Sequence, residues 1–310
     1  MSGKKGKKIN IVLIILVSVV LAVSLIVQLA PIIGVELPSY SEIFSMLGVG
    51  PKPDRSRNYV KFLDVGNADC ILIHSKGKFA LIDSGDNSDE GWGLVSKLRS
   101  IGVTEIETAF VTHPHADHIG GMDLVLENFN VKQLVMPDYK PTQTADVNTY
   151  NQLVEAVKKK SVKVYRPAIG NQYKIGDFKL TTVAYLPGQL EENDRSVVLK
   201  AECGGVSFLF MGDAGENTEN EIIRSRQNVK SHVLKLGHHG SKTATTETFL
   251  DYVNPQCAIV TAAFDNSYGH PSDEVVERLN GKNIKLYQTG VNGTISCYVE
   301  KTGLVIETER

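Results

Sequence analysis

The stretch THPHADHIGG, Thr112 to Gly121, places three histidines and an aspartate between positions 113 and 118. The apolar run that leads into it, TAFVT, is typical of a β-strand. We expect the glycine pair after it to open a helix, so the four polar side chains lie on a tight loop between a strand and a helix. Imidazole nitrogens and carboxylates are ligands of zinc, and also of manganese or iron. The stretch therefore predicts a metal centre.

The number of ligands in this loop predicts two metal ions rather than one. A single tetrahedral ion rarely takes four ligands from so short a segment. We expect His113 and His115 to hold one ion, and Asp117 and His118 to hold the other. The alternative, a surface loop that is rich in histidine by chance, leaves the polar groups at the ends of later strands unexplained.

Three later strand-like runs each end in polar groups suited to the same centre. FLFMGDA brings Asp213 after an apolar strand, in a position to bridge two ions. LKLGHHGSK brings His238 and His239, and SYGHPS brings His270 after AIVTAAF. Because the carboxyl ends of several strands can meet at one edge of a sheet, we expect these side chains to converge there.

Strand-like and helix-like segments alternate along the chain in two halves of similar size. Short β-branched or apolar runs such as YVKFLDV, CILIHS and VSFLFMGD alternate with helix-like segments such as ADVNTYNQLVEAVKKK and DEVVERLN. This alternation predicts an α/β layered fold, with sheets inside and helices outside. We expect one catalytic domain over residues 58–310.

The N-terminal region has a different composition from the rest. Residues 1–8 carry four lysines and no acid, and residues 9–35 carry no charged side chain. Such a run exceeds the roughly 20 residues that cross a bilayer as a helix. We interpret it as an uncleaved transmembrane signal anchor, with a cleaved signal peptide or a buried helix as alternatives. A linker over residues 36–57 would follow. The protein would then be single-pass in the cell membrane, with its N-terminus in the cytoplasm and its catalytic domain outside.

Overall charge and cysteine content restrict the function less than the motifs do. The formal net charge is -2, which does not predict nucleic-acid binding, although a local basic groove stays compatible with it. The four cysteines contain no CxxC pair. Two disulfides are one arrangement that an exported domain permits, and buried free thiols are the interpretation that we prefer.

The motifs together resemble a known family. FLDVGNADCILI, ALIDSG, HPHADHIGG, FLFMGDA, LKLGHHGS and YGHPS occur in this order, and they are similar to the extracytoplasmic metallo-hydrolase domain of ComEC-type DNA-uptake competence proteins. The resemblance covers residues 59 to about 295 and implies the four-layer αβ/βα sandwich of metallo-β-lactamase-fold hydrolases, here preceded by one transmembrane helix. One departure is that no histidine lies between His118 and Asp213, where many members have one. The ion of His113 and His115 would then lack one protein ligand.

The resemblance also suggests roles for individual residues. Asp117 would bind an ion and orient the attacking water, and Asp213 would bridge. We predict that His239 is a ligand and that His238 faces the substrate. His270 would protonate the leaving group or serve as a further ligand. The neighbouring substrate-binding candidates are Ser241 and Lys242.

These roles predict a metal-dependent hydrolase with two divalent ions, zinc by preference and manganese as the alternative. A phosphodiesterase or nuclease acting on extracellular DNA is our first interpretation. The alternative is a cell-envelope phosphodiesterase, such as a teichoic-acid phosphorylcholine esterase, and the second alternative is a non-catalytic component of an uptake or envelope complex. The partners implied are the lipid bilayer and a nucleic acid or phosphodiester-containing polymer. The sequence implies no protein partner.

Overall fold

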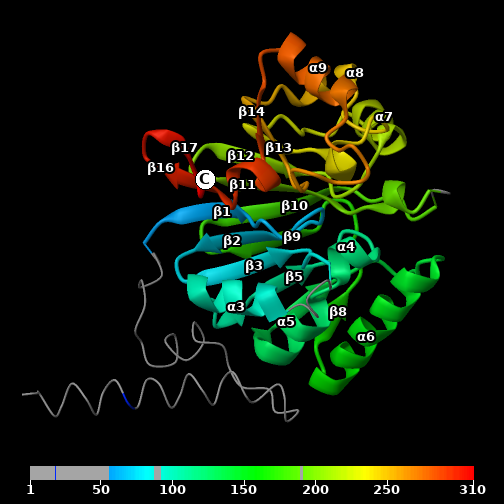
Figure 1. Ribbon diagram of the computed structural model, residues 1–310, viewed down its shortest axis with the longest axis vertical. Helices are drawn as coiled ribbons and strands as arrows, with labels where there is room; N and C mark the ends of the chain where they lie inside the picture. Colours follow the sequence, from blue (N-terminus) through cyan, green and yellow to red (C-terminus); the bar gives the residue numbers. More distant parts are fainter. Residues whose placement is uncertain (1–17, 19–55, 87–91, 189–190) are drawn as a thin grey trace, which may run out of the picture. The chain divides into compact units, whose positions relative to one another are not determined.

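The computed structural model describes residue 18 and residues 56–86, 92–188 and 191–310 (Figure 1). Contacts divide the chain into two compact units, residues 1–52 and 53–310, and the elements below belong to the second. Three expected segments lie outside the described residues, apart from residue 18 and residues 56–57. They are the basic tail, the membrane span at residues 9–35 and the linker. Within the described part of the chain, no helix has both the length and the apolarity to cross a membrane.

The first large sheet has eight strands. Its order is β17-β16-β1-β2-β3-β5-β7-β8, antiparallel from β17 to β3 and parallel from β3 to β8. The strands are β1 (Asn58–Phe62), β2 (Ile71–Ser75), β3 (Lys78–Ile82), β5 (Thr108–Phe110), β7 (Gln133–Val135), β8 (Lys163–Tyr165), β16 (Ile295–Glu300) and β17 (Gly303–Thr308). A separate pair joins β4 (Glu105–Ile106) and β6 (Asn130–Val131).

The second large sheet has seven strands in the order β15-β14-β13-β12-β11-β10-β9. It is antiparallel from β9 to β12 and parallel from β12 to β15. The strands are β9 (Gln172–Ile175), β10 (Phe178–Ala184), β11 (Val198–Cys203), β12 (Val206–Phe210), β13 (Val233–Lys235), β14 (Cys257–Val260) and β15 (Lys285–Gln288).

The helices lie on the two outer faces of these sheets. In Figure 1, α3, α5 and α6 lie below the first sheet, and α7, α8 and α9 lie above the second. The α-helices are α3 (Trp92–Ile101), α4 (Ala116–Ile119), α5 (Met122–Asn128), α6 (Thr144–Lys160), α7 (Glu216–Arg224), α8 (Glu247–Val253), α9 (Asp273–Gly281) and α10 (Thr289–Asn292). The short 3₁₀ segments are η2 (Asn193–Arg195) and η3 (Gly237–Gly240).

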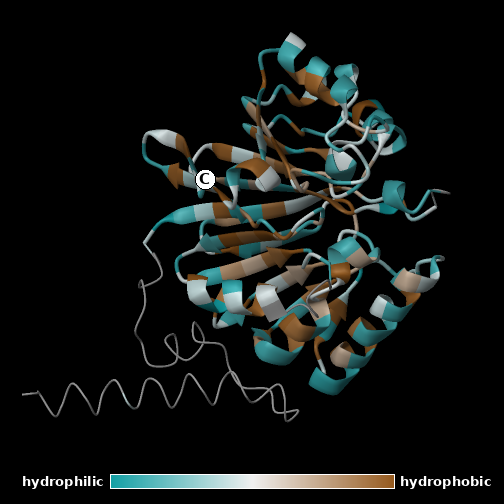
Figure 2. Ribbon diagram, in the orientation of Figure 1, coloured by the Kyte–Doolittle hydropathy of each residue, from teal (hydrophilic) through white to brown (hydrophobic). Residues whose placement is uncertain are grey.

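Three apolar clusters separate these elements into four layers. One fills the space between the two sheets and contains Phe62 and Ile73 of the first sheet together with Phe178 and Phe208 of the second. A second joins the first sheet to α3, α5 and α6, and a third joins the second sheet to α7, α8 and α9. Figure 2 shows apolar residues along the strands of both sheets. Alternate strand residues face opposite apolar layers, so the predicted αβ/βα sandwich is confirmed.

Local details differ from the sequence-based expectations, and three elements illustrate how. The metal-binding loop contains the short helix α4, so Asp117 and His118 lie on a helical turn instead of an irregular loop. Strands β9 and β17 were not expected from the sequence. Each lies at an end of its sheet, and an edge strand needs less apolar alternation because one side has no neighbour.

The four cysteines are free and buried, which confirms the interpretation that we preferred over two disulfides. They are Cys70, Cys203, Cys257 and Cys297. Burial raises the pKa of the Cys257 thiol to about 11, so this thiol stays protonated at neutral pH. The cysteines therefore act as small core residues.

Candidate metal centre

Helix α4 is fixed at the carboxyl edge of the first sheet. The backbone N–H of Ala116 donates to the Asp146 carboxylate of α6 at 2.7 Å, which satisfies one free donor of the first turn. The carbonyl of His118 accepts from the backbone N–H of Ser84 at 2.7 Å, and the carbonyl of Asp117 accepts from that of Asp69 at 3.1 Å. These bonds hold the two ligand candidates of α4 against the segment that precedes β2 and the segment that follows β3.

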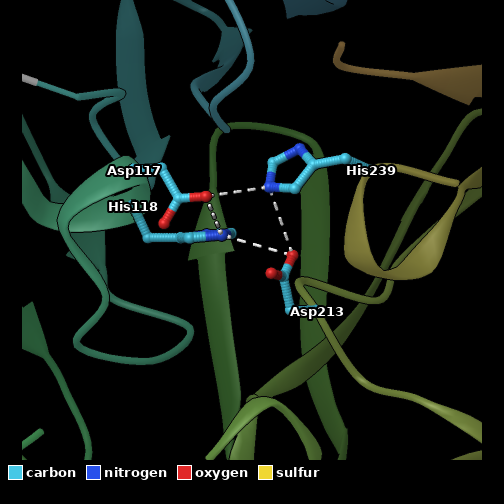
Figure 3. A group of neighbouring side chains, drawn as sticks. All are labelled: Asp117, His118, Asp213 and His239. Carbon is cyan, nitrogen blue, oxygen red and sulfur yellow. Dashed lines mark hydrogen bonds and ion pairs between the residues drawn. The ribbon is translucent and has the colours of Figure 1, made fainter. Parts of the chain in front are cut away.

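Four ligand candidates converge at this edge, and we call them the inner ligand group: Asp117, His118, Asp213 and His239 (Figure 3). One ligand atom from each lies within 4.8 Å of the other three. Nε2 of His239 is 3.2 Å from Oδ2 of Asp117 and 3.6 Å from Oδ1 of Asp213. His118, Asp213 and His239 are buried, whereas the Asp117 side chain is 34% exposed. The group therefore opens to solvent through Asp117.

Two atoms of the inner ligand group lack hydrogen-bond partners, as expected of atoms that bind a metal ion. Nε2 of His118 and Oδ1 of Asp213 are buried and have no hydrogen-bond partner among the described residues. They approach each other to 3.2 Å without the alignment of a hydrogen bond. Buried polar atoms normally have partners, and an unsatisfied pair calls for an explanation such as an ion. The donor set fits a divalent cation of the zinc or manganese type.

The electrostatics of the inner ligand group are those of a strongly coupled network. Burial alone would lower the pKa of His118, but the carboxylates of Asp213, Asp117 and Asp83 outweigh burial and hold it well above its usual range. Burial alone would raise the pKa of Asp213, but His118 and His239 hold it well below its usual range. A divalent cation would stabilise the same carboxylates and would displace the histidine protons.

Each histidine of the inner ligand group is oriented by a buried acceptor. Nδ1 of His118 donates to Oδ2 of Asp83 at 2.8 Å, and Nδ1 of His239 donates to the carbonyl of Thr261 at 2.7 Å. Both bonds leave Nε2 free to bind an ion, which is how partners behind metal ligands usually fix the tautomer. Asp83 also accepts from the backbone and hydroxyl of Thr112, at 2.8 and 2.7 Å. Asp83 therefore supports the inner ligand group from behind His118.

A buried ion pair lies directly behind His239. Nζ of Lys235 is 2.8 Å from Oδ2 of Asp69, and both side chains are at most 1% exposed. Asp69 also accepts a hydrogen bond from the Thr261 hydroxyl, and its Oδ1 lies 3.6 Å from Nδ1 of His239. The pair links the segment after β1 to β13 of the other sheet. It therefore ties the position of His239 to the packing of both sheets.

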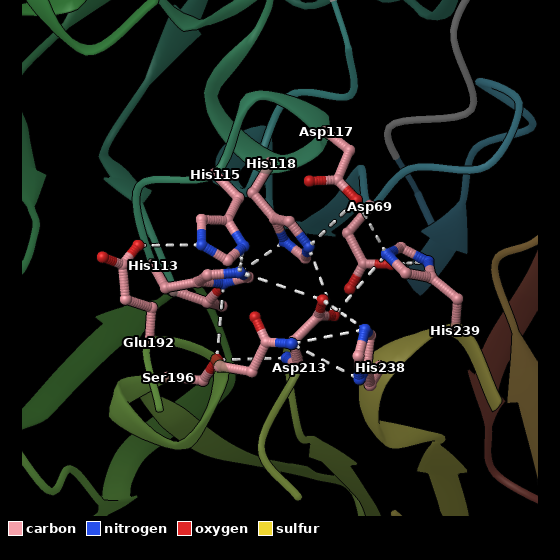
Figure 4. Close-up of polar contacts among 12 residues, drawn as sticks. Asp69, His113, His115, Asp117, His118, Glu192, Ser196, Asp213, His238 and His239 are labelled. Carbon is pink, nitrogen blue, oxygen red and sulfur yellow. Dashed lines mark hydrogen bonds and ion pairs between the residues drawn. The ribbon is translucent and has the colours of Figure 1, made fainter. Parts of the chain in front are cut away.

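The remaining two histidines of the motif form what we call the outer ligand group, His113 and His115 (Figure 4). Nε2 of His113 lies 3.0 Å from Nδ1 of His115. Nε2 of His115 donates to Oε2 of Glu192 at 2.9 Å, which leaves Nδ1 free on the side of His113. Ser196 lies 3.4 Å behind His113, at Nδ1. These two ring nitrogens face each other at hydrogen-bond distance, so an ion held by both would replace their mutual contact.

Asp213 faces both groups. Its Oδ1 lies near His118 and His239, and its Oδ2 lies 3.8 Å from Nε2 of His113. The turn before it requires glycine, because Gly212 has a φ of 54° and a Cβ there would lie 2.9 Å from Cβ of Thr112. The arrangement has the form of a carboxylate between two ion positions.

His238 and His239 adopt a strained backbone that turns their side chains to different places. Both have left-handed conformations, with φ of 46° and 50°. Such a conformation costs about 1–3 kcal/mol per non-glycine residue and is typical of functional sites. His239 is buried among the ligands, whereas the His238 side chain is 30% exposed and its Nε2 lies 4.0 Å from Oδ2 of Asp213. Asn193 borders His238 at 3.3 Å.

Two of the other three predicted site residues, His270 and Ser241, lie around His238. The His270 ring lies 5.7 Å from that of His238, so both are near the centre. Ser241 is buried, and its hydroxyl lies 3.0 Å from that of Thr243, which in turn lies 3.4 Å from Nδ1 of His238. Lys242 is exposed, and no contact places it at the ligand groups. His74 and His232 bond to Arg57 and Ser207 outside the centre, as expected of structural histidines.

Three supporting residues were not identified from the sequence. They are Glu192, in the segment that lacks a histidine, and Lys235 and Thr261, each within an apolar strand-like run. Their roles depend on partners far away in the chain, since the Glu192–His115 bond spans 77 positions. A signal was present at Lys235, because a charged residue inside the apolar run VLKL needs a buried partner.

The fold and the centre define a class of protein. Residues 63–262 match the model of the metallo-β-lactamase superfamily, and the chain belongs to this superfamily. The chain is similar to ComE operon protein 3 of Bacillus subtilis, with 30% identity over 77% of this chain and 33% of that protein. It is also similar to competence protein ComA of Neisseria gonorrhoeae, with 25% identity over 78% of this chain and 32% of that protein. The resemblance to ComEC-type competence proteins is thus confirmed, and the chain spans about a third of the length of these relatives.

Solved structures support the fold. The metallo-β-lactamase fold protein YhfI of Bacillus subtilis aligns with a TM-score of 0.51 and 10% identity, over 77% of this chain and 99% of that chain. Igni18, a metallo hydrolase of Ignicoccus hospitalis, aligns with a TM-score of 0.52 and 14% identity, over 77% of this chain and 98% of that chain. At such identities the likeness concerns the fold alone.

Proposed function

We propose that the protein is a membrane-anchored, metal-dependent phosphodiesterase that cleaves DNA outside the cell. The observation that carries the proposal is the Asp213 carboxylate, whose two oxygens face the inner and the outer ligand group. Two divalent ions bound side by side supply Lewis-acid activation of water and neutralise charge on a phosphoryl group. The name of one relative, a competence protein, directs the proposal to DNA as substrate.

The residues around the two positions have separate tasks in this proposal. The inner ligand group would hold one ion, and the outer ligand group together with Asp213 would hold the other. Asp117, the most exposed carboxylate of the inner ligand group, orients the attacking water. Burial lowers the pKa values of both His238 and His270, so these rings are neutral at neutral pH. They are suited to donate hydrogen bonds to the phosphate and the leaving group.

The proposed membrane anchor rests on the sequence. Residues 9–35 contain no charge and exceed the roughly 20 residues of a membrane span. The lysines of residues 1–8 favour a cytoplasmic N-terminus, which would leave the catalytic domain outside the cell.

The test uses the full-length chain in detergent, stripped of metal with a chelator and reloaded with zinc or manganese. The substrates are end-labelled single-stranded DNA and, separately, 4-nitrophenyl phosphorylcholine. We expect metal-dependent DNA cleavage that Asp117→Ala and His115→Ala remove. Asp251→Ala is the matched control, because this carboxylate is 67% exposed and pairs with Lys282 on the surface.

The second candidate is a cell-envelope phosphodiesterase. The net charge of -2 favours a polyanionic DNA substrate no more than a zwitterionic phosphorylcholine headgroup. Cleavage of the choline ester without cleavage of DNA would establish this candidate. Binding of metal without cleavage of either substrate would favour a non-catalytic component of an uptake or envelope complex.

A further inference from the structure

The loop between β14 and α9 exposes two large aromatic side chains beside the metal centre. Phe264 is 77% exposed and Tyr268 is 71% exposed, the highest values among the large hydrophobic residues that the structure describes. Neither ring packs in the core, so burial of apolar surface on folding does not explain these two aromatic residues. Two such rings on one loop next to a reaction centre are typical of a binding surface.

The backbone of the loop that carries these rings is braced on two sides. Nδ2 of Asn266 donates to the carbonyls of Ala263 and His270, at 2.9 and 2.6 Å, and the backbone N–H of His270 donates back to Oδ1 of Asn266 at 3.0 Å. On the other side, Gly290 of α10 packs so closely that a Cβ there would lie 2.2 Å from the backbone nitrogen of Phe264. A braced loop loses little conformational entropy when a ligand binds.

A continuous series of rings leads from the exposed loop to the metal centre. Tyr268 stacks on His270 at 5.7 Å and 22°, and His270 meets His238 edge-on at 5.7 Å. His238 in turn lies 4.0 Å from Asp213, measured from Nε2 to Oδ2. Tyr268 is therefore two ring contacts away from a residue that borders the proposed ion positions. A group bound on Tyr268 would belong to the unit next to the bond that is cleaved.

We propose that Tyr268, supported by His270, stacks on a nucleobase next to the scissile phosphodiester, so that the substrate is single-stranded nucleic acid. This inference rests on the proposed nuclease function and specifies its substrate. Aromatic side chains bind single strands by stacking on successive bases, largely independent of sequence. Bases within a duplex are already stacked and cannot reach the ring. Phe264, on the same loop, offers a second surface for the neighbouring base.

The charged residues near the loop are compatible with a second kind of ligand besides a nucleobase. Lys242 is exposed and suits a phosphate group. Its positive charge helps to lower the pKa of Glu274, at the start of α9. Asp265, between the two rings in sequence, suits a cation instead. Aromatic rings beside an acid also bind quaternary ammonium groups. A choline headgroup is therefore the alternative that the experiment must separate from a base.

The experiment measures cleavage by the full-length, metal-loaded chain of two labelled ten-unit strands, oligothymidine and a matching strand of abasic tetrahydrofuran residues. We expect Tyr268→Ala to raise KM for oligothymidine about tenfold, within the range for loss of one base stack. The same variant should cleave the abasic strand like the original protein. Tyr268→Phe, which keeps the ring, should behave like the original protein on both strands.

Binding provides a readout that does not depend on cleavage. In the Asp117→Ala background, the Kd for fluorescent oligothymidine should rise about tenfold when Tyr268→Ala is added, with no rise for the abasic strand. Equal KM values for the original protein and Tyr268→Ala on oligothymidine, or equal losses on both strands, would overturn the stacking role and leave the nuclease function standing. If the original protein cleaves only 4-nitrophenyl phosphorylcholine, the nuclease function and the stacking role both fall.

Discussion

The inner and outer ligand groups lie side by side but are built differently. The inner ligand group draws side chains from α4, from the segment after β12 and from η3, and buried partners in Asp83 and Thr261 orient its histidines. The outer ligand group consists of two residues of one motif, and the side chains of His115 and its partner Glu192 are 17% and 11% exposed. Asp213 is the residue that both groups share.

This difference predicts two ions of unequal affinity. Affinity rises with the number of protein ligands and with the rigidity of their partners. The inner ligand group supplies four ligands, whereas the outer ligand group supplies two and relies on Oδ2 of Asp213 for a third. We therefore expect the inner position to fill first and the outer position to fill at higher metal concentration.

The largest effect is expected where the two groups share a ligand. Asp213→Ala should remove both ions and lower activity about a thousandfold, because Lewis-acid stabilisation of the transition state is worth several kcal/mol. His115→Ala should remove only the more weakly bound ion. Metal content per chain after gel filtration, with Asp251→Ala as control, measures the difference. Loss of both ions in His115→Ala would show that the positions do not fill independently.

A smaller effect is expected from the acids behind the ligands. Partners that orient a histidine ligand usually change metal affinity by about 10- to 100-fold when mutated. Asp83→Asn should weaken the first ion by this amount, because its carboxylate accepts from Nδ1 of His118. Glu192→Gln should weaken only the second ion, because its carboxylate accepts from Nε2 of His115.

Titration of the metal-free variants with metal, in the presence of a competing metal indicator, gives the affinities for the first and the second ion. The comparison fails if Asp83→Asn and Glu192→Gln weaken the same binding step. Unfolding temperatures of the chelated variants serve as the control for a general loss of structure, since Asp83 is fully buried.

The sequence identified the ligand candidates better than the residues that support them. Residue type and local pattern were sufficient to propose these candidates, because His113, His115, Asp117 and His118 lie within six positions of the chain and Asp213 follows a strand. The support of His115 by Glu192 depends on how the segment before η2 packs, which no local pattern encodes. The alternation of strands and helices predicted an α/β layered fold, and the resemblance to ComEC-type proteins implied its four layers. Edge strands such as β9 carry too few buried residues to give a clear pattern.

The pH dependence of metal affinity should also differ between the two ligand groups. This is the smallest of the expected effects. The carboxylates outweigh burial and raise the pKa values of His118 and His239 above the usual 6.5, so in the metal-free protein both rings carry protons at and somewhat above that pH. An ion must displace these protons, and affinity for the first ion should rise up to about tenfold per pH unit for each proton released. The rise should end once pH exceeds the raised pKa values.

Burial holds the pKa of His113 well below its usual range, so this ligand is already neutral and has no proton to release near neutral pH. The first binding step should therefore release protons at any pH below the raised pKa values of His118 and His239, and His113 should add none to the second step near neutral pH. Calorimetric titration with zinc in buffers of different ionisation enthalpy measures the protons released at each step. Equal proton release in the two steps would contradict the assignment of the tighter ion to the inner ligand group.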